Sequence, residues 1–168
     1  AACGAPSGRA DKRVGDVPGR DAKTIHRLLE VDFGSSEVTP FVHNDQHPLQ
    51  ADAVVIDGMS MVDTTLFESL LRGCRMGCKL ILVGDSDQLP SVGPGNVLRD
   101  LIDSGCIPTV ELKQVFRQAA ESRIVTNAHR IVAGEYPDLK TKDNDFFFLR
   151  RQSAAAVLST VTELVAKR

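Results

Sequence analysis

VVIDGMSMVD (Val54–Asp63) and LILVGDSDQLPSVGPG (Leu80–Gly95) are the two stretches that decide the fold of this chain. Each begins in an unbroken apolar run, Ala53–Ile56 in the first and Leu80–Val83 in the second. Runs of this length without polar alternation are typical of parallel strands that are buried on both faces. Four apolar residues between the runs recur at helical spacing: Leu66, Phe67, Leu70 and Leu71. The pattern therefore predicts strand, helix and strand, joined by a right-handed crossover.

Polar residues follow both predicted strands at the point where the apolar runs end. Asp57 comes directly after the first run, and Asp85 and Gln88 follow the second. In open parallel sheets, ligands bind just beyond the carboxyl ends of the strands. We therefore expect any chemistry to lie at this edge of the sheet.

The remaining pattern alternates strands with helices. Further strands are predicted at the end of Ala1–Ala5, at Thr109–Leu112 and at Asp145–Leu149. Helices are predicted at four places: residues 25–29 after a Thr24 cap, 97–104 after an Asn96 cap, Glu121–Ala133, and Ala154–Ala166. A short helix is also expected within residues 8–17. This order predicts an α/β fold with a mainly parallel sheet.

Composition is that of an ordinary globular domain. The chain has 168 residues, 42% apolar and 25% charged, and a net charge of -2, so bulk charge gives no pull toward nucleic acid or membrane. No apolar run is long enough to span a membrane, and no signal peptide heads the chain. Cys74 and Cys78 lie four apart, but no His or second Cys pair accompanies them. We expect reduced thiols in a cytoplasmic protein rather than a metal site.

Three residues could carry chemistry, and each has a second interpretation. Asp57 at a strand end is how P-loop nucleotide hydrolases hold Mg²⁺, yet buried strands also end in Asp for capping reasons. Gln88 could reach a γ-phosphate or simply bond the backbone of a Pro/Gly-rich turn. Arg117, after the Thr109–Leu112 run, could neutralise phosphate charge or remain a solvated arginine.

Five segments together resemble a known family. VVIDGMSMVD, LILVGDSDQLPSVGPGNVLRDLI, ELKQVFRQAAESRIVTNAHRI, GAPSGRADKR and TIHRLL resemble the first motor domain of RecD-like superfamily 1 DNA helicases, in the right order from about Ala1 to Phe148. The resemblance implies a RecA-like P-loop NTPase domain of the AAA type. It also implies ATP and Mg²⁺ as cofactors, single- or double-stranded DNA as partner, and 5′-to-3′ unwinding or translocation in DNA repair and recombination.

Site residues follow from the resemblance. Asp57 looks like the Walker B aspartate for Mg²⁺. Gly84, Asp85 and Gln88 look like motif III, with Gln88 sensing the γ-phosphate, and Arg117 looks like the arginine on that phosphate. The segments GAPSGRA and TIHRLL imply a DNA-binding set: Pro6, Ser7, Gly8, Arg9, Thr24 and His26. His26 could equally be a packed helix residue.

Two departures from the family pattern bear on activity. No GxxxxGK[ST] motif is present, so the phosphate cradle and its lysine are missing. Gly58 stands where the family usually places the catalytic glutamate. Loss of a general base typically costs about two to four orders of magnitude in rate. We therefore expect a partial motor domain, truncated at its N-terminus and inactive alone.

The resemblance also predicts which parts of the motor lie outside this sequence and which part of the sheet is exposed. The P-loop segment is expected upstream of Ala1, and the second motor domain after Arg168. The missing P-loop strand is expected to pack beside Ala53–Ile56, and the exposed edge or face to favour self-association.

Other functional classes stay open. Gly58 breaks catalysis while sparing the fold, so the chain could be a catalytically dead single-stranded DNA-binding or scaffold module. An unrelated α/β protein that binds a small ligand at its sheet edge is the third alternative.

Overall fold

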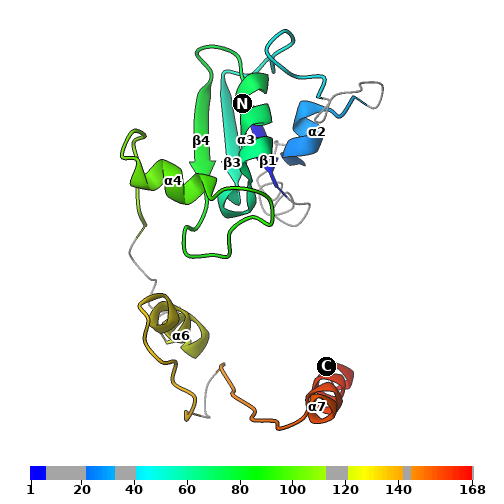
Figure 1. Ribbon diagram of the computed structural model, residues 1–168, viewed down its shortest axis with the longest axis vertical. Coiled ribbons are helices and arrows are strands. Elements are labelled where there is room, and N and C mark those ends of the chain that lie inside the picture. The colour runs from blue at the N-terminus through cyan, green and yellow to red at the C-terminus, as the bar shows by residue number, and fades with distance from the viewer. Residues whose placement is uncertain (7–21, 33–40, 113–120, 142–144, 168) are drawn as a thin grey trace. The chain divides into compact units, whose positions relative to one another are not determined.

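A computed structural model of the chain describes residues 1–6, 22–32, 41–112, 121–141 and 145–167. They belong to two compact units, Ala1–Val110 and Glu111–Arg168. Figure 1 labels the helices and strands of both units, and each unit is treated by itself.

The first unit is built on a parallel sheet. Its described strands lie in the order β2-β1-β3-β4, and every pair is parallel. Their bounds are Ala2–Ala5 for β1, Ala22–Thr24 for β2, Ala53–Asp57 for β3 and Lys79–Val83 for β4. The predicted α/β class is therefore confirmed, as is the predicted strand near the start of the chain. β2 was not predicted, because three residues carry too little periodicity to read.

The predicted order of strand, helix and parallel strand is also confirmed. β3 leads through the short 3₁₀ helix η1 (Met59–Met61) into α3 (Thr64–Gly73), which returns the chain to β4. Helix α3 begins where it does because the Asp63 side chain accepts the Leu66 N–H at 2.8 Å. β4 then pairs with β3 along its whole length.

Helices α3 and α2 (Ile25–Leu29) lie over one face of the sheet (Figure 1). Thr24 caps α2 as predicted, accepting the Arg27 N–H at 3.3 Å. A cluster of buried side chains joins these helices to β3, among them Ile25, Leu29, Val54, Ile56, Met59, Val62 and Leu70. Each contributes about 1.5–3 kcal/mol to folding through burial. This core holds β3 and β4 in place, and with them the polar residues at the carboxyl ends of these strands.

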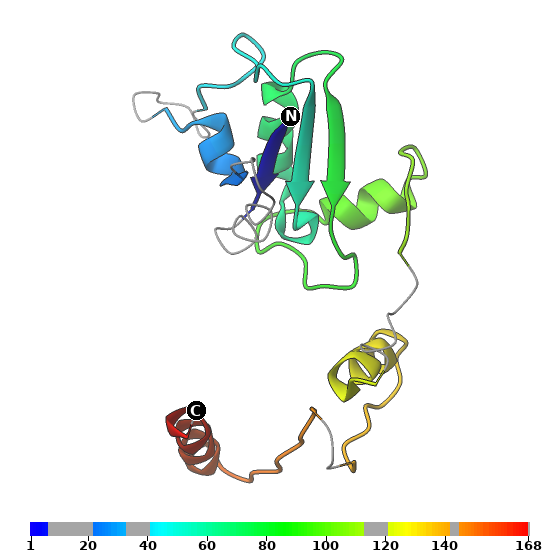
Figure 2. The same cartoon turned by 180° about the vertical axis from the view of Figure 1, so that it is seen from behind.

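The open edge of the sheet is not where it was predicted. Ala53–Ile56 has a strand on both sides, so the expectation that a missing strand would pack beside it is wrong. Among the described strands, β4 lies at the edge. Its Ile81 and Val83 are 49% and 47% exposed. They lie on the face of the sheet opposite α2 and α3, which no described helix covers (Figure 2). A sequence run shows that a strand is buried, but not the order of its neighbours.

Helix α4 (Val97–Asp103) follows the loop after β4. Asn96 occupies the predicted cap position, but its side chain makes no capping hydrogen bond. Val97 and Leu98 are buried as expected.

The second unit holds helices α6 (Arg123–Val132) and α7 (Ala154–Ala166). The bounds of α7 are as predicted, while α6 begins at Arg123, after a Ser122 cap and two residues later than expected. Asn127 is 2% exposed and donates to the Asp138 carbonyl at 3.2 Å while accepting the Asp138 N–H at 2.7 Å. This pair of bonds holds the following loop against α6. None of the described helices combines the length and apolar content needed to cross a membrane.

Two predicted strands are wrong. Thr109–Leu112 and Asp145–Leu149 are both irregular, and neither forms strand pairing with another described segment. Most of their apolar side chains are exposed, at 87% for Val110 and 64% for Phe147. An apolar run becomes a strand only where a neighbour satisfies its backbone groups. The helix expected within residues 8–17 lies outside the described residues.

Candidate functional site

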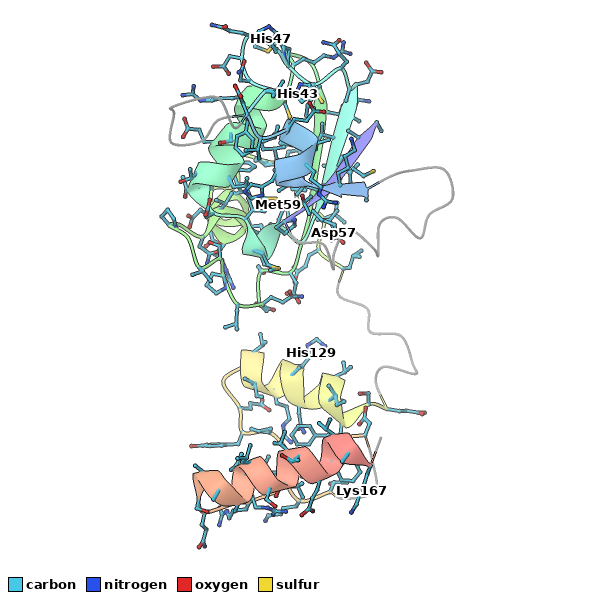
Figure 3. The ribbon with its side chains drawn as sticks, turned by 90° about the vertical axis from the view of Figure 1, so that its right-hand side faces the viewer. His43, His47, Asp57, Met59, His129 and Lys167 are labelled. Carbon is cyan, nitrogen blue, oxygen red and sulfur yellow. The ribbon has the colours of Figure 1, made fainter. Side chains whose placement is uncertain are left out.

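The carboxyl ends of β3 and β4 meet at one edge of the sheet. Asp57 is the last residue of β3 and lies opposite Val83, the last residue of β4. Gly84 and Asp85 follow immediately. Figure 3 shows Asp57 and Met59 in the lower half of the first unit, away from His43 and His47 in its upper half. The predicted polar edge therefore exists.

Asp57 is partly buried and is held by the turn that follows it. Its Oδ1 accepts the Gly58 N–H at 2.8 Å. Within the described part of the chain, the other carboxylate oxygen has no hydrogen-bond partner. A single carboxylate with a free oxygen suits Mg²⁺, which prefers oxygen ligands and usually keeps several of its waters. The residues present therefore fit a cation held mainly through water.

The turn after Asp57 has a backbone that favours glycine. Gly58 has φ 78° and ψ 32°, in the left-handed region. Its carbonyl accepts the Met61 N–H at 3.0 Å, which starts η1. Met59 and Ser60 are buried. A residue with a β-carbon at position 58 would have to bear the strain of this conformation.

The loop after β4 is organised by Asp85. The Asp85 carboxylate accepts the Asp87 N–H at 3.0 Å and the Gln88 side-chain amide at 3.3 Å. Its carbonyl also accepts the Gln88 N–H at 3.2 Å. Arg99 on α4 donates to the Ser86 carbonyl at 2.8 Å. Gln88 is exposed, and its side-chain oxygen remains available as an acceptor.

Gly84 has a packing role in this structure. A β-carbon there would come within 2.8 Å of Leu98 and 3.1 Å of the Met59 nitrogen. The exit of β4 is thus pressed against both η1 and α4. Asp57 and Gln88 share the edge, but no direct bond joins them among the described residues.

The residues predicted to face DNA are only partly described. Pro6 follows β1, whereas Ser7, Gly8, Arg9 and also Arg117 lie outside the described residues. The Thr24 hydroxyl oxygen caps α2. His26 is exposed, and its ring lies 5.9 Å from that of Phe41. His26 is therefore not a packed core residue.

The cysteines are free thiols. Burial, with the neighbouring Cys78 thiol as a smaller cause, raises the pKa of Cys74 to about 11. In the portion of the chain that the structure describes, no group of three or more His, Cys, Asp or Glu side chains could hold a metal ion.

Three contacts of this region were missed from the sequence. In the loop after β4, Gly93 lies against Asp63, Pro94 accepts from Thr64, and Ser86 accepts from Arg99; Asp63 and Thr64 come about thirty residues before the loop residues that they touch. The Pro and Gly residues predict a tight loop, but no pattern of neighbouring residues predicts that this loop packs against the start of α3.

Comparison with known proteins places the chain in a family. A family model described as an AAA domain matches residues 2–148. The chain is 42% identical over 133 residues to an ATP-dependent RecD2 DNA helicase of Deinococcus radiodurans, covering 79% of this chain and 18% of that protein.

Two other relatives match a shorter part of the chain. A RecBCD enzyme subunit RecD of Mycobacterium tuberculosis is 44% identical over 91 residues, covering 54% of this chain and 15% of that protein. DNA helicase B of Mus musculus is 36% identical over 98 residues, covering 54% of this chain and 9% of that protein. The chain spans a fifth or less of the length of each of these relatives. Its sequence and its parallel sheet make it a member of the AAA domain family, of the RecD-like helicase kind.

Proposed function

We propose that this chain forms part of the first motor domain of an ATP-dependent DNA helicase. The motor would couple ATP hydrolysis to 5′-to-3′ unwinding or translocation on DNA, in repair or recombination. The observation that carries the proposal is the shared edge of Asp57 and the Asp85–Gln88 loop, at the carboxyl ends of paired parallel strands. Ligands of open α/β sheets bind at this position.

Each residue has a proposed role toward nucleotide. Asp57 would hold Mg²⁺ through the carboxylate oxygen that has no partner among the described residues, and through the metal's waters. When bound, Mg²⁺ neutralises charge on the phosphate oxygens. Gln88 senses the γ-phosphate, with Asp85 orienting its amide and Gly84 bringing the loop close to η1. Arg117 contributes positive charge to the same phosphate.

A second set of residues is proposed to meet DNA. Pro6, Ser7, Gly8 and Arg9 would lie along a single strand, with Thr24 and His26 beside them. The exposed His26 ring supports this, because exposed aromatic rings can stack on nucleic-acid bases.

The proposal includes two further parts of such a motor. A P-loop segment and a second motor domain would complete the nucleotide site, and the 168-residue chain alone would not hydrolyse ATP. The free thiols suit the reducing cytoplasm, which we propose as its location.

One observation favours a second candidate, a catalytically dead single-stranded DNA-binding or scaffold module. Position 58 lacks a side chain that could act as a base, and its left-handed backbone favours glycine. The turn therefore suits a glycine at the position where a catalytic motor of this family is expected to carry the glutamate.

An exchange of segments separates the two candidates. The matched segment of the Deinococcus RecD2 helicase is replaced by this chain, with Gly58 or with Gly58→Glu. DNA-stimulated ATP hydrolysis in the Glu form, lost again when Asp57→Asn is added, supports the motor. Asp103→Asn, an exposed aspartate on α4, is the control and should change nothing. Tight oligonucleotide binding without hydrolysis in either form supports the scaffold, and the absence of both activities rejects both candidates.

A further inference from the structure

The loop after β4 is joined to the start of α3 by a forked hydrogen bond. The Pro94 carbonyl accepts both the Thr64 N–H and the Thr64 hydroxyl, each at 2.9 Å. The N–H is one of the helix-terminal donors that have no partner within the helix itself. A carbonyl thirty residues further along the chain therefore satisfies the start of α3.

Two glycines allow this approach. A β-carbon at Gly93 would overlap the Asp63 carboxylate, and one at Gly95 would overlap the Thr64 hydroxyl. Gly95 also has φ +86°, a conformation that side chains rarely adopt. The loop thus lies directly against the first residues of α3, with no room for a side chain between them.

The fork closes a ring of connected elements. From Asp57 the chain passes through Gly58 and η1 to Thr64, and this path is held by the buried Met59 and Val62. From Pro94 the loop returns to Asp85 and then to β4. The pairing of β3 with β4 completes the ring. Movement of the strand end that carries Asp57 would therefore displace the loop that carries Gln88.

We propose that Thr64 is a positioning residue that makes the metal-binding end of β3 and the phosphate-sensing loop move as one body. This inference rests on the proposed function, because it concerns the regulation of the same site. The simpler alternative is that Thr64 only begins α3. That role needs the backbone N–H and the Asp63 cap, whereas the coupling needs the hydroxyl as well.

Three variants separate these roles. Thr64→Val keeps the shape and the N–H but removes the hydroxyl bond, and Thr64→Ser restores the hydroxyl. Thr65→Val is the matched control, because Thr65 is the next residue on the exposed surface of the same helix and its hydroxyl makes no bond to the loop.

The first measurement is amide hydrogen exchange of the 168-residue chain without ligand. Thr64→Val is expected to raise the exchange rate of the Gln88 amide about fivefold, the factor that one net hydrogen bond supplies. Thr64→Ser and Thr65→Val should match the original chain. An unchanged Gln88 amide in Thr64→Val overturns the inference, whatever the nucleotide results.

The second measurement uses the RecD2 helicase whose matched segment has been replaced by this chain with Gly58→Glu. This protein is called the exchange protein below. Thr64→Val is expected to lower the DNA stimulation of kcat about fivefold while KM for ATP stays the same, and Thr64→Ser should rescue it. If Thr64→Val speeds exchange of the Gln88 amide but leaves the DNA stimulation normal, Thr64 does not couple the two parts of the site and serves only to begin α3. If the exchange protein never hydrolyses ATP, the proposed motor function fails, and the hydrogen-exchange result still decides whether the fork holds the loop.

Discussion

Substitution of Gly58 tests whether the turn between β3 and η1 requires a glycine. Its φ of 78° lies in the left-handed region, where a β-carbon crowds the following carbonyl oxygen and costs about 1–2 kcal/mol. Gly58→Ala should therefore lower the free energy of unfolding by about that amount, and Gly58→Asn by less, since Asn tolerates this conformation. For a unit that spans Ala1–Val110, a loss of 1 kcal/mol lowers Tm by roughly 4 °C.

Gly77 supplies a matched control for the backbone cost. It has φ +82°, and a β-carbon built there meets nothing within 4 Å. Gly77→Ala should thus measure the left-handed cost alone. Urea and thermal unfolding, followed by circular dichroism, compare both variants with the original chain.

The outcome bears directly on catalysis. A cost at position 58 means that Gly58→Glu would gain a carboxylate, with the roughly 10²–10⁴-fold rate benefit of a general base, while lowering the stability of the turn. If Gly58→Ala unfolds at the same urea concentration as the original chain while Gly77→Ala is destabilised, the turn relaxes without strain. The reasoning about position 58 would then be refuted.

Three further predictions concern the core, a thiol and two carboxylates. Leu70→Ala should cost about 2–5 kcal/mol in urea unfolding, because Leu70 is fully buried between helix and sheet. Cys74, with a pKa of about 11, should be alkylated by iodoacetamide at a rate that still rises about tenfold per pH unit from pH 8 to 10, measured by mass spectrometry. Hydroxyl donors, Thr141 for Asp138 and Ser122 for Asp145, hold the pKa of both carboxyls below the usual range. The contribution of these two carboxylates to the stability of the second unit should therefore be fully present above the ordinary carboxyl pKa of about 3.9 and be lost as the pH falls through the lowered folded values, measured by exchange of the Asp138 amide.

Each of these has a control. Leu71, next to Leu70 but 48% exposed, should tolerate alanine with a much smaller loss, and equal losses would contradict the assigned core. Levelling of the Cys74 alkylation rate near pH 8.5 would show an ordinary thiol. The acid sensitivity should disappear in a chain that carries both Asp138→Asn and Asp145→Asn, and its persistence there would point to other groups.

Local pattern was enough to predict much of the first unit. The apolar runs predicted β3 and β4, and the Asp63 and Thr24 caps mark where α3 and α2 begin. These features depend on residues within a few positions of each other. The same kind of signal failed at Thr109–Leu112 and Asp145–Leu149, because whether an apolar run becomes a strand depends on a partner that the run does not encode.

The sequence by itself determined the fold class, the family and the presence of polar residues at strand ends, because periodicity and short motifs are properties of neighbouring residues. Only the tertiary structure decided that β4 lies at the described edge of the sheet, that Gly58 takes a left-handed backbone, and that Pro94 meets Thr64. These depend on how distant segments pack. The spacing of residues along the chain does not show that the Pro94 carbonyl will contact Thr64, thirty residues earlier, at the start of α3.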